Sequence, residues 1–292
     1  MDGSNPFHRV AVLGPGLLGG SILFALRKRD SEANLSVWGR REEPVEQLTS
    51  TGTVQHGSTD LAEILKENPD LIILATPIGN MPQIARQIAE TSPGPAIITD
   101  VGSTKVGIVE VLESIFADRG DLEFIGSHPM AGSEKTGLEN ADADLFEDAA
   151  CILTRSPTTN LDALERVQSL WQYLGCSTSL LEPDVHDETV ARISHLPHLV
   201  AAAVVKAGLE KFSGAADFCG GGFRDTTRIA SGPPEMWSEI LLENRGKVIE
   251  SLRDLIRELE SVQQALNDLD RDRITRFLEE AKQLRDQTLS ND

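Results

Sequence analysis

The sequence has few cysteines, a deficit of positive charge and no long hydrophobic run. Its three cysteines form no CxxC pair, which is typical of a reducing compartment and gives no zinc site; they are Cys151, Cys176 and Cys219. Lys and Arg number 27 against 46 Asp and Glu, and the net charge of −19 argues against nucleic acid as a partner. No segment approaches the roughly 18 apolar residues of a membrane span, and the N-terminus has no signal-peptide run. We therefore expect a cytoplasmic protein with no membrane association.

The chain is long enough for two domains, with 292 residues of which 40% are hydrophobic. Strand and helix patterns alternate over residues 1–182, whereas residues 183–292 have only a helical period. We expect an α/β Rossmann-like dinucleotide-binding domain followed by an all-α domain. Long amphipathic helices beside a nucleotide domain commonly form a dimer core, so we expect a homodimer through residues 183–292.

A glycine-rich loop follows the first expected strand, which covers residues 8–13. The sequence GPGLLGG matches GxGxxG between a strand and a helix. The glycines allow a tight turn, a close approach of pyrophosphate and close helix packing, while the helix N-terminus offers N–H donors. A chance glycine turn is the alternative. We assign cofactor binding to Gly14, Gly16, Leu17, Leu18 and Gly19.

Two arginines follow the second expected strand, residues 35–38. NAD enzymes place Asp or Glu about 20 residues after the glycines, where it binds the ribose 2′-hydroxyl. Arg40 and Arg41 occupy that place here, and guanidinium groups would hold a 2′-phosphate. The prediction is NADP, with NAD less favoured. Two solvated arginines, partly neutralised by Glu42 and Glu43, are the alternative.

Three further strands are expected at residues 71–75, 96–99 and 123–126, and polar segments follow each. Parallel strands end at one edge of a sheet, where ligands bind. Thr76 and Pro77 are therefore assigned to the cofactor. Ser103 either touches the cofactor or a catalytic group, or caps the helix that begins near Thr104. His128 lies in an expected loop and is our candidate for proton transfer; a loop histidine fixed by a hydrogen bond is the alternative.

The second half is expected to be helical throughout. One helix should cover residues 183–208, and Pro197 should kink or interrupt it. His195 and His198 share a face, but no third ligand has spacing suitable for zinc, so no metal is predicted. A loop with a glycine hinge at residues 220–222 should follow, and then helices over residues 237–259 and 270–287.

Six segments together are highly specific: GPGLLGGS after the first strand, LATP at 74–77, DVGSTK at 100–105, GSHPMAGSEKTG at 126–137, SHLPH at 194–198 and GGGFRDTTRIA at 220–230. With them, the chain resembles the prephenate/arogenate dehydrogenase family of tyrosine biosynthesis. The resemblance implies an oxidative decarboxylation in which hydride passes to the nicotinamide and the ring of a small anionic substrate becomes aromatic.

The resemblance also implies roles for individual residues. His128 would be the catalytic histidine that accepts the ring hydroxyl proton, and Ser103 would orient it. His198 would bind substrate, Arg228 would hold a substrate carboxylate, and Arg224 would add positive charge at the mouth of the site. Ser133 and Glu134 would form a polar pair gating access, and we count both with the substrate-binding residues.

Alternative substrates and alternative functions stay open. The sequence does not separate prephenate from arogenate. The resemblance favours prephenate, the commonest bacterial substrate of the family, with arogenate as the alternative. A 3-hydroxyacid or 6-phosphogluconate-type dehydrogenase would need a catalytic lysine on the first long helix, where only Lys206 occurs. A non-catalytic NADP-binding protein need not keep His128, Ser103 and Arg228 together.

Overall fold

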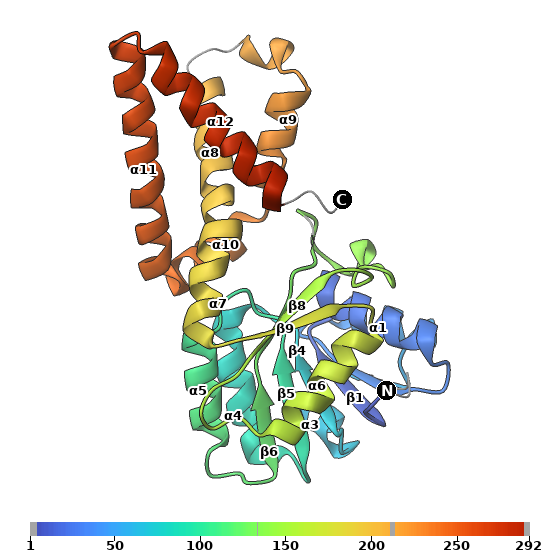
Figure 1. The fold of residues 1–292 in the computed structure, drawn as a ribbon. Helices are drawn as coiled ribbons and strands as arrows, with labels where there is room; N and C mark the ends of the chain where they lie inside the picture. Colours follow the sequence, from blue (N-terminus) through green and yellow to red (C-terminus); the bar gives the residue numbers. More distant parts are fainter. Residues whose placement is uncertain (1–4, 133, 211–213, 289–292) are drawn as a thin grey trace. The chain divides into compact units, whose positions relative to one another are not determined.

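A computed structural model of the protein describes residues 5–132, 134–210 and 214–288 (Figure 1). The chain has two compact units, Met1–Asn244 and Arg245–Asp292. All of the candidate site positions fall within the first unit. The expected domain boundary at residue 182 does not coincide with this division and stays a prediction.

The first unit contains a parallel sheet in the order β3-β2-β1-β4-β5-β6. Every neighbouring pair in it is parallel, and this strand order is the one found in dinucleotide-binding folds. The expected Rossmann-like architecture is therefore confirmed, although the short β3 was not predicted. The strands are β1 (Arg9–Leu13), β2 (Asn34–Trp38), β3 (His56–Ser58), β4 (Leu71–Leu74), β5 (Ala96–Asp100) and β6 (Leu122–Ile125).

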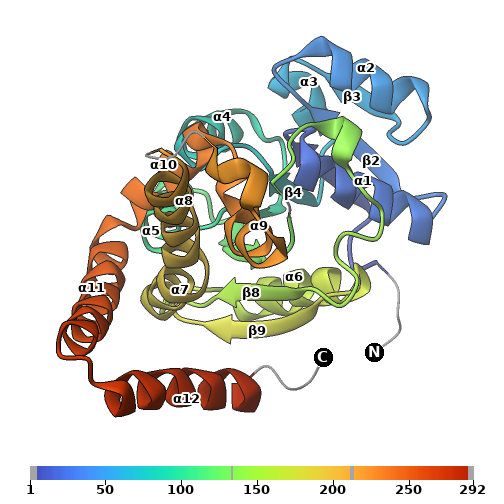
Figure 2. The same ribbon diagram turned by 90° about the horizontal axis from the view of Figure 1, so that it is seen from above.

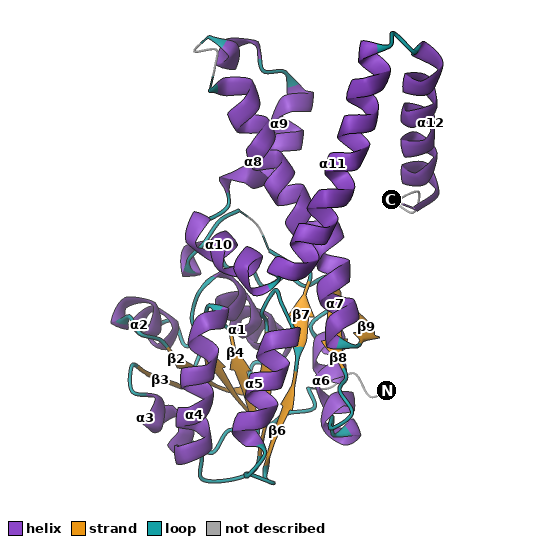
Figure 3. Ribbon diagram, turned by 90° about the vertical axis from the view of Figure 1, so that its left-hand side faces the viewer, coloured by secondary structure: helices purple, strands orange, loops and turns teal. Residues whose placement is uncertain are grey.

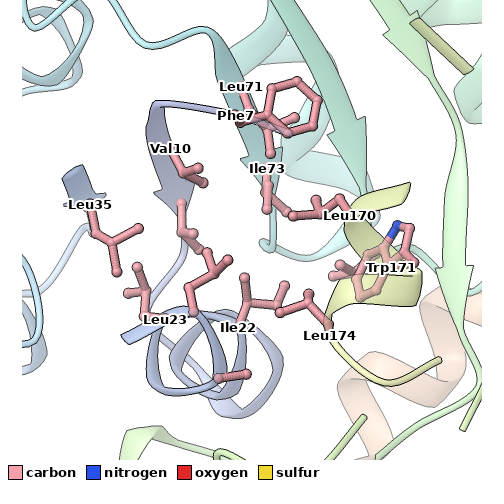
Figure 4. Close-up of a cluster of buried hydrophobic side chains, with 14 of the residues drawn as sticks. Phe7, Val10, Ile22, Leu23, Leu35, Leu71, Ile73, Leu170, Trp171 and Leu174 are labelled. Carbon is pink, nitrogen blue, oxygen red and sulfur yellow. The ribbon is translucent and has the colours of Figure 1, made fainter. Parts of the chain in front are cut away.

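Helices cover both faces of this sheet, because alternate strand residues point to opposite sides. In β1, Val10 and Val12 belong to one buried cluster, while Ala11 and Leu13 belong to the other. Figure 4 shows the first cluster, where Trp171 packs near Ile22 and Leu174. α1 (Leu17–Arg29), α2 (Glu42–Ser50) and α6 (Leu161–Tyr173) contribute to the first cluster; α3 (Leu61–Lys66), α4 (Met81–Thr91) and α5 (Val106–Phe116) contribute to the second.

A second, three-stranded sheet continues from the first (Figure 3). Its strands are β7 (Ser127–Pro129), β8 (Ala150–Thr154) and β9 (Ser177–Leu181), with β7 antiparallel to β8. The expectation that His128 lies in a loop is wrong, because it lies on β7 and pairs with Ile152. Sequence pattern alone could not find β7, since a strand of three residues carries no periodicity and its partner is distant in the chain.

A helical segment completes the first unit. The expected helix over residues 183–208 consists of α7 (Pro183–Val190), a π-helical turn (Ala191–His195) and α8 (Leu196–Leu209), with Pro197 in the first turn of α8. The predicted glycine hinge is wrong: Gly221 and Gly222 begin α9 (Gly221–Thr227), which lies beside α8 (Figure 2). α10 (Pro234–Glu243) follows.

The second unit, Arg245–Asp292, contains α11 (Arg245–Asn267) and α12 (Arg271–Thr288). The single helix expected over residues 237–259 is therefore wrong, because α10 ends at Glu243 and α11 begins at Arg245. Of the helices described, none is long and apolar enough to cross a membrane.

Candidate active site

A cavity of about 360 Å³ lies where β1, β2 and β4 end. The glycine loop, the two arginines and the Thr76–Pro77 segment all line it. Ser103 and His128, which were expected at the same edge, are not among its lining residues. The lining residues are Gly14, Pro15, Gly16, Trp38, Arg40, Arg41, Pro44, Ala75, Thr76 and Pro77.

The glycine loop has no room for side chains at two positions. Gly14 has a φ of +116°, and a Cβ there would lie 2.5 Å from the carbonyl oxygen of Ala75. A Cβ at Gly19 would lie 2.0 Å from the carbonyl oxygen of Gly14. Gly16, in contrast, faces open space and caps α1 without a side-chain hydrogen bond. The first N–H groups of α1 therefore remain available for an anion.

The polar groups of this cavity fit a dinucleotide phosphate. Arg40 and Arg41 are exposed, and neither forms a hydrogen bond or ion pair with any residue in the described part of the chain; the expected neutralisation by Glu42 and Glu43 does not take the form of an ion pair. The hydroxyl oxygen of Thr76 is buried without a partner. Two free guanidinium groups and an unsatisfied hydroxyl are suited to a phosphorylated ligand.

His128 is buried, with only 7% of its surface exposed. Its strand, β7, is hydrogen-bonded to Asp100 at the end of β5. The Ser127 backbone N–H donates to Asp100 Oδ1 at 3.1 Å, and the Ser127 hydroxyl donates to the Asp100 carbonyl at 2.5 Å. That hydroxyl also accepts a hydrogen bond from Trp171 Nε1 at 3.1 Å. The Thr99 and Ser127 hydroxyls are also hydrogen-bonded, at 2.9 Å. These hydrogen bonds of Ser127 hold the backbone that carries the His128 ring.

The ring of His128 contacts a second histidine, from α7. Nδ1 of His128 lies 2.9 Å from Nε2 of His186, and Nδ1 of His186 lies 2.7 Å from Oδ1 of Asp187. We call His128, His186 and Asp187 the relay. All three side chains are buried, and they come from two elements that are far apart in the sequence.

Asp187 also binds the start of α5. Its Oδ1 accepts the Lys105 N–H at 2.7 Å, and its Oδ2 accepts the Val106 N–H at 2.9 Å. Asp187 therefore serves the helix terminus that Ser103 was considered to cap, and that alternative is wrong. Ser103 is half-buried and makes no hydrogen bond to any described residue, including His128. Its assigned role stays a prediction.

Burial controls the protonation of the relay. Burial lowers the pKa of His128 well below its ordinary value. The positive charge of Lys105 lowers it further, as would protonation of His186 or His195. Burial also lowers the pKa of His186; the hydrogen bond to Asp187 raises it, but burial has the larger effect. Burial raises the pKa of Asp187, but hydrogen bonds from His186 and from two backbone N–H groups outweigh it and lower the pKa overall. Near neutral pH the relay has two neutral rings and one carboxylate.

A buried ion pair lies next to the relay, because the Lys105 backbone N–H binds Asp187. Lys105 Nζ is 2.6 Å from Asp100 Oδ2, and both side chains are fully buried. The Asp100 carboxylate also accepts the Gly102 and Ser127 N–H groups, and Lys105 donates to the Thr104 carbonyl at 3.0 Å. Hydrogen bonds of this kind are what a buried pair needs to offset its desolvation.

His195 and His198 lie against one tryptophan. The His198 ring stacks on Trp237 with centroids 3.6 Å apart, while His195 meets it edge-on at 6.3 Å. Asn244 Nδ2 lies 3.3 Å from His195 Nδ1 and donates to the Asp187 carbonyl at 2.7 Å. Nε2 of His195 and Nδ1 of His198 are buried without partners. These orphaned nitrogens mark polar sites that a ligand or water could satisfy.

The remaining candidates are more exposed. Arg228 Nη1 forms an ion pair with Glu134 Oε2 at 2.9 Å, which joins two segments that the sequence assigned to substrate binding. Arg224 donates to the Cys219 carbonyl at 3.2 Å and is exposed. Ser133 lies outside the described residues.

Sequence reasoning missed five residues of this site: Lys105, His186, Asp187, Trp237 and Asn244. His186 and Asp187 stand in the first helix of the segment that was read as helical, without a motif to mark them. The adjacent pair of a histidine and a carboxylate was the one available signal, since a carboxylate commonly orients a functional imidazole.

Comparison with known proteins gives a consistent result. Two family models match, described as prephenate dehydrogenase, nucleotide-binding domain, over residues 24–180 and prephenate dehydrogenase, dimerization domain, over residues 182–280. A prephenate dehydrogenase of Bacillus subtilis is 32% identical over 281 residues, which cover 95% of this chain and 75% of that protein.

Two solved structures are similar throughout. A prephenate dehydrogenase from Aquifex aeolicus, in complex with hydroxyphenyl propionate and NAD+, is 30% identical with a TM-score of 0.87, covering 95% of this chain and 97% of that one. An arogenate dehydrogenase from Synechocystis is 29% identical with a TM-score of 0.81, covering 96% and 99%.

Proposed function

This chain belongs to the prephenate dehydrogenase family, and we propose that it converts prephenate to 4-hydroxyphenylpyruvate and carbon dioxide with NADP as the oxidant. It is an NAD(P)-dependent oxidoreductase. The observation that carries the proposal is the neutral, buried His128, in the same compact unit as a cavity suited to a dinucleotide.

His128 serves as the base. Its Nδ1 is engaged by His186, so Nε2 is the nitrogen left for the substrate. Nε2 accepts the proton of the ring hydroxyl while the carbon that bears this hydroxyl loses its hydride and is oxidised. The bond to the ring carboxylate then breaks, carbon dioxide leaves, and the electron pair makes the ring aromatic. The oxygen recovers a proton, so the histidine ends the cycle neutral.

Arg228 and His198 hold the substrate. The net charge of −19 would repel a dianion, so binding depends on local cations. Arg228 has Glu134 as its partner, and a substrate carboxylate would compete for the same guanidinium. His198 is held flat against Trp237, with Nδ1 unsatisfied. Arg224 contributes charge nearby in the sequence, and Ser103 and Ser133 keep the roles that the resemblance implies.

A bound nicotinamide cofactor would supply the acceptor for the hydride. Gly14 and Gly16, which line the cavity with Thr76 and Pro77, would hold its pyrophosphate together with the first N–H groups of α1. Arg40 and Arg41 favour NADP because a free guanidinium pair attracts a 2′-phosphate, which a carboxylate would repel. The Aquifex relative was solved with NAD+, so the preference for NADP is a property that we assign to this chain.

Arogenate is the second candidate substrate. It carries an ammonium group where prephenate has a keto group, and the carboxylate of Glu134, whose side chain is 30% exposed, could bind that cation. The similar Synechocystis structure is an arogenate dehydrogenase. We also propose a boundary at residue 182 between cofactor and helical domains, and a homodimer formed through residues 183–292, because the second family model describes a dimerization domain.

The test is a two-by-two initial-rate assay, with prephenate or arogenate against NADP or NAD. We expect the highest rate with prephenate and NADP. A higher rate with arogenate would select the second candidate. No turnover of either substrate, in a protein that still binds NADP, would refute the proposed function.

A further inference from the structure

The relay has only one arrangement of protons that satisfies all of its contacts. An ionised Asp187 can only accept, so His186 Nδ1, at 2.7 Å, must donate to it. A neutral imidazole has a single N–H, which makes His186 Nε2 an acceptor. His128 Nδ1, 2.9 Å away, must therefore donate to that nitrogen. Nε2 of His128 is then left with a free lone pair.

We propose that His186 and Asp187 are positioning residues that keep the proton of His128 on Nδ1, and so make Nε2 the base. This inference rests on the proposed function for its catalytic meaning, but the proton arrangement itself does not. When Nε2 accepts a proton, the Nδ1–H bond to His186 becomes a bond from a cation and strengthens. The Asp187 carboxylate lies on the other side of His186, and its negative charge stabilises the positive charge that forms on His128.

The surroundings fix this arrangement. Asp187 is anchored by the Lys105 and Val106 N–H groups, so its carboxylate cannot turn toward another partner without losing them. Asn244 binds its backbone carbonyl at 2.7 Å. The relay therefore ties α7 to the start of α5, and a displacement of either element would change the protonation of His128.

Other charged or titratable groups also face the relay. Lys105 and Asp100 lie on the β5 side, His195 on the π-helical turn, and Cys151 on β8. Lys105 is paired with Asp100, and burial raises the pKa of Cys151 well above its ordinary range, so that thiol stays neutral. Within the relay, the Asp187 carboxylate is hydrogen-bonded to the His186 ring at 2.7 Å.

A matched pair of variants separates positioning from packing. His186→Leu removes the acceptor for His128, whereas His186→Gln can place a carboxamide oxygen where Nε2 was. Both remove the imidazole, so a role in packing alone predicts equal damage. We expect kcat to fall roughly 10- to 100-fold in the Leu variant, because one hydrogen bond to a charged group is lost. In the Gln variant, kcat should stay within a few-fold of the wild-type value.

The pH profile of kcat/KM gives a second readout. The neutral base is active, so the rate falls as pH drops through the pKa of His128. Loss of the acceptor removes a hydrogen bond that stabilises the imidazolium, which lowers that pKa. The acid limb should move to lower pH in His186→Leu and remain in place in His186→Gln. Affinity for NADP should be unchanged in both, and His56→Gln, at an exposed histidine, should match wild type.

Nitrogen NMR of the histidine rings tests the proton arrangement without turnover. With six histidines in the chain, His128→Asn assigns the signal of His128. We expect the Nδ1–H tautomer in wild type and a shift toward Nε2–H in His186→Leu. An Nε2–H tautomer in wild type, or equal kcat in the Leu and Gln variants, would overturn the inference. If wild-type protein turns over neither substrate, the proposed function fails, and the NMR result still decides the relay.

Discussion

The cofactor cavity and the relay are built in opposite ways. The cavity is lined by short runs of consecutive residues, such as Gly14 to Gly16, and its arginines remain exposed. The relay is formed by buried side chains from β7 and α7, and its strength depends on every partner being present. Substitutions at the cavity should therefore change affinity locally, whereas substitutions at the relay should change catalysis and stability together.

The largest expected effect lies in the buried region. His128→Asn should lower kcat by roughly 10²- to 10⁴-fold, which is the range for loss of a general base. Affinity for NADP, measured by fluorescence titration, should be unchanged, because the cavity does not include His128. Retained turnover would remove His128 from its role, and His56→Asn provides the control for loss of a histidine.

The buried ion pair should be the next most sensitive feature. Lys105→Ala leaves the Asp100 carboxylate buried without its cation, which costs about 3–5 kcal/mol in the free energy of unfolding. Lys28 and Asp144 form a pair of the same type at the surface, with about half of each side chain exposed. Lys28→Ala should cost no more than about 1 kcal/mol in urea denaturation. Equal losses in the two variants would contradict the account.

Acid should destabilise the folded protein, because its buried histidines resist protonation. Burial lowers the pKa of His195 from 6.5 to about 4. Because the unfolded chain binds the proton first, stability present above pH 6.5 is lost as pH falls toward 4, by roughly 3 kcal/mol for this group. His195→Gln should make the fall in unfolding free energy shallower over that window. An unchanged slope would show that His195 is not held neutral.

The smallest expected effect lies at the cavity. Replacing Arg40 and Arg41 together by Ala should weaken NADP binding roughly 10- to 100-fold, which corresponds to hydrogen bonds with a charged group. NAD affinity should change little, because NAD has no 2′-phosphate. Calorimetric titration with both cofactors measures this. A parallel loss of NADP and NAD affinity would assign the arginines to the pyrophosphate instead.

The sequence predicted the cavity better than the relay for a physical reason. A GxGxxG turn is specified by neighbouring residues, so Gly14 and Gly19 could be placed from local sterics alone. His186 has no local constraint that reveals its partner, because its contact with His128 arises from the packing of α7 against the second sheet. The same holds for Asp187, which binds the start of α5 from a distant segment.

The breaks between helices after residue 183 were also predictable only where a local residue causes them. Pro197 correctly indicated a disturbance, yet the helix continues through a π-helical turn, since proline is tolerated in the first turn of α8. The break at Asn244 was not predicted. Its side chain bonds the Asp187 carbonyl and His195, a tertiary contact that the local sequence does not reveal.

The pH dependence of kcat/KM for the wild-type enzyme tests the central claim most directly. If neutral His128 is the base, the rate should stay constant from neutral pH to below 6.5 and fall only at lower pH, because burial lowers the pKa of His128. The His128→Asn protein should lack that limb. A wild-type rate that already declines above pH 6.5 as the solution is acidified would contradict the account.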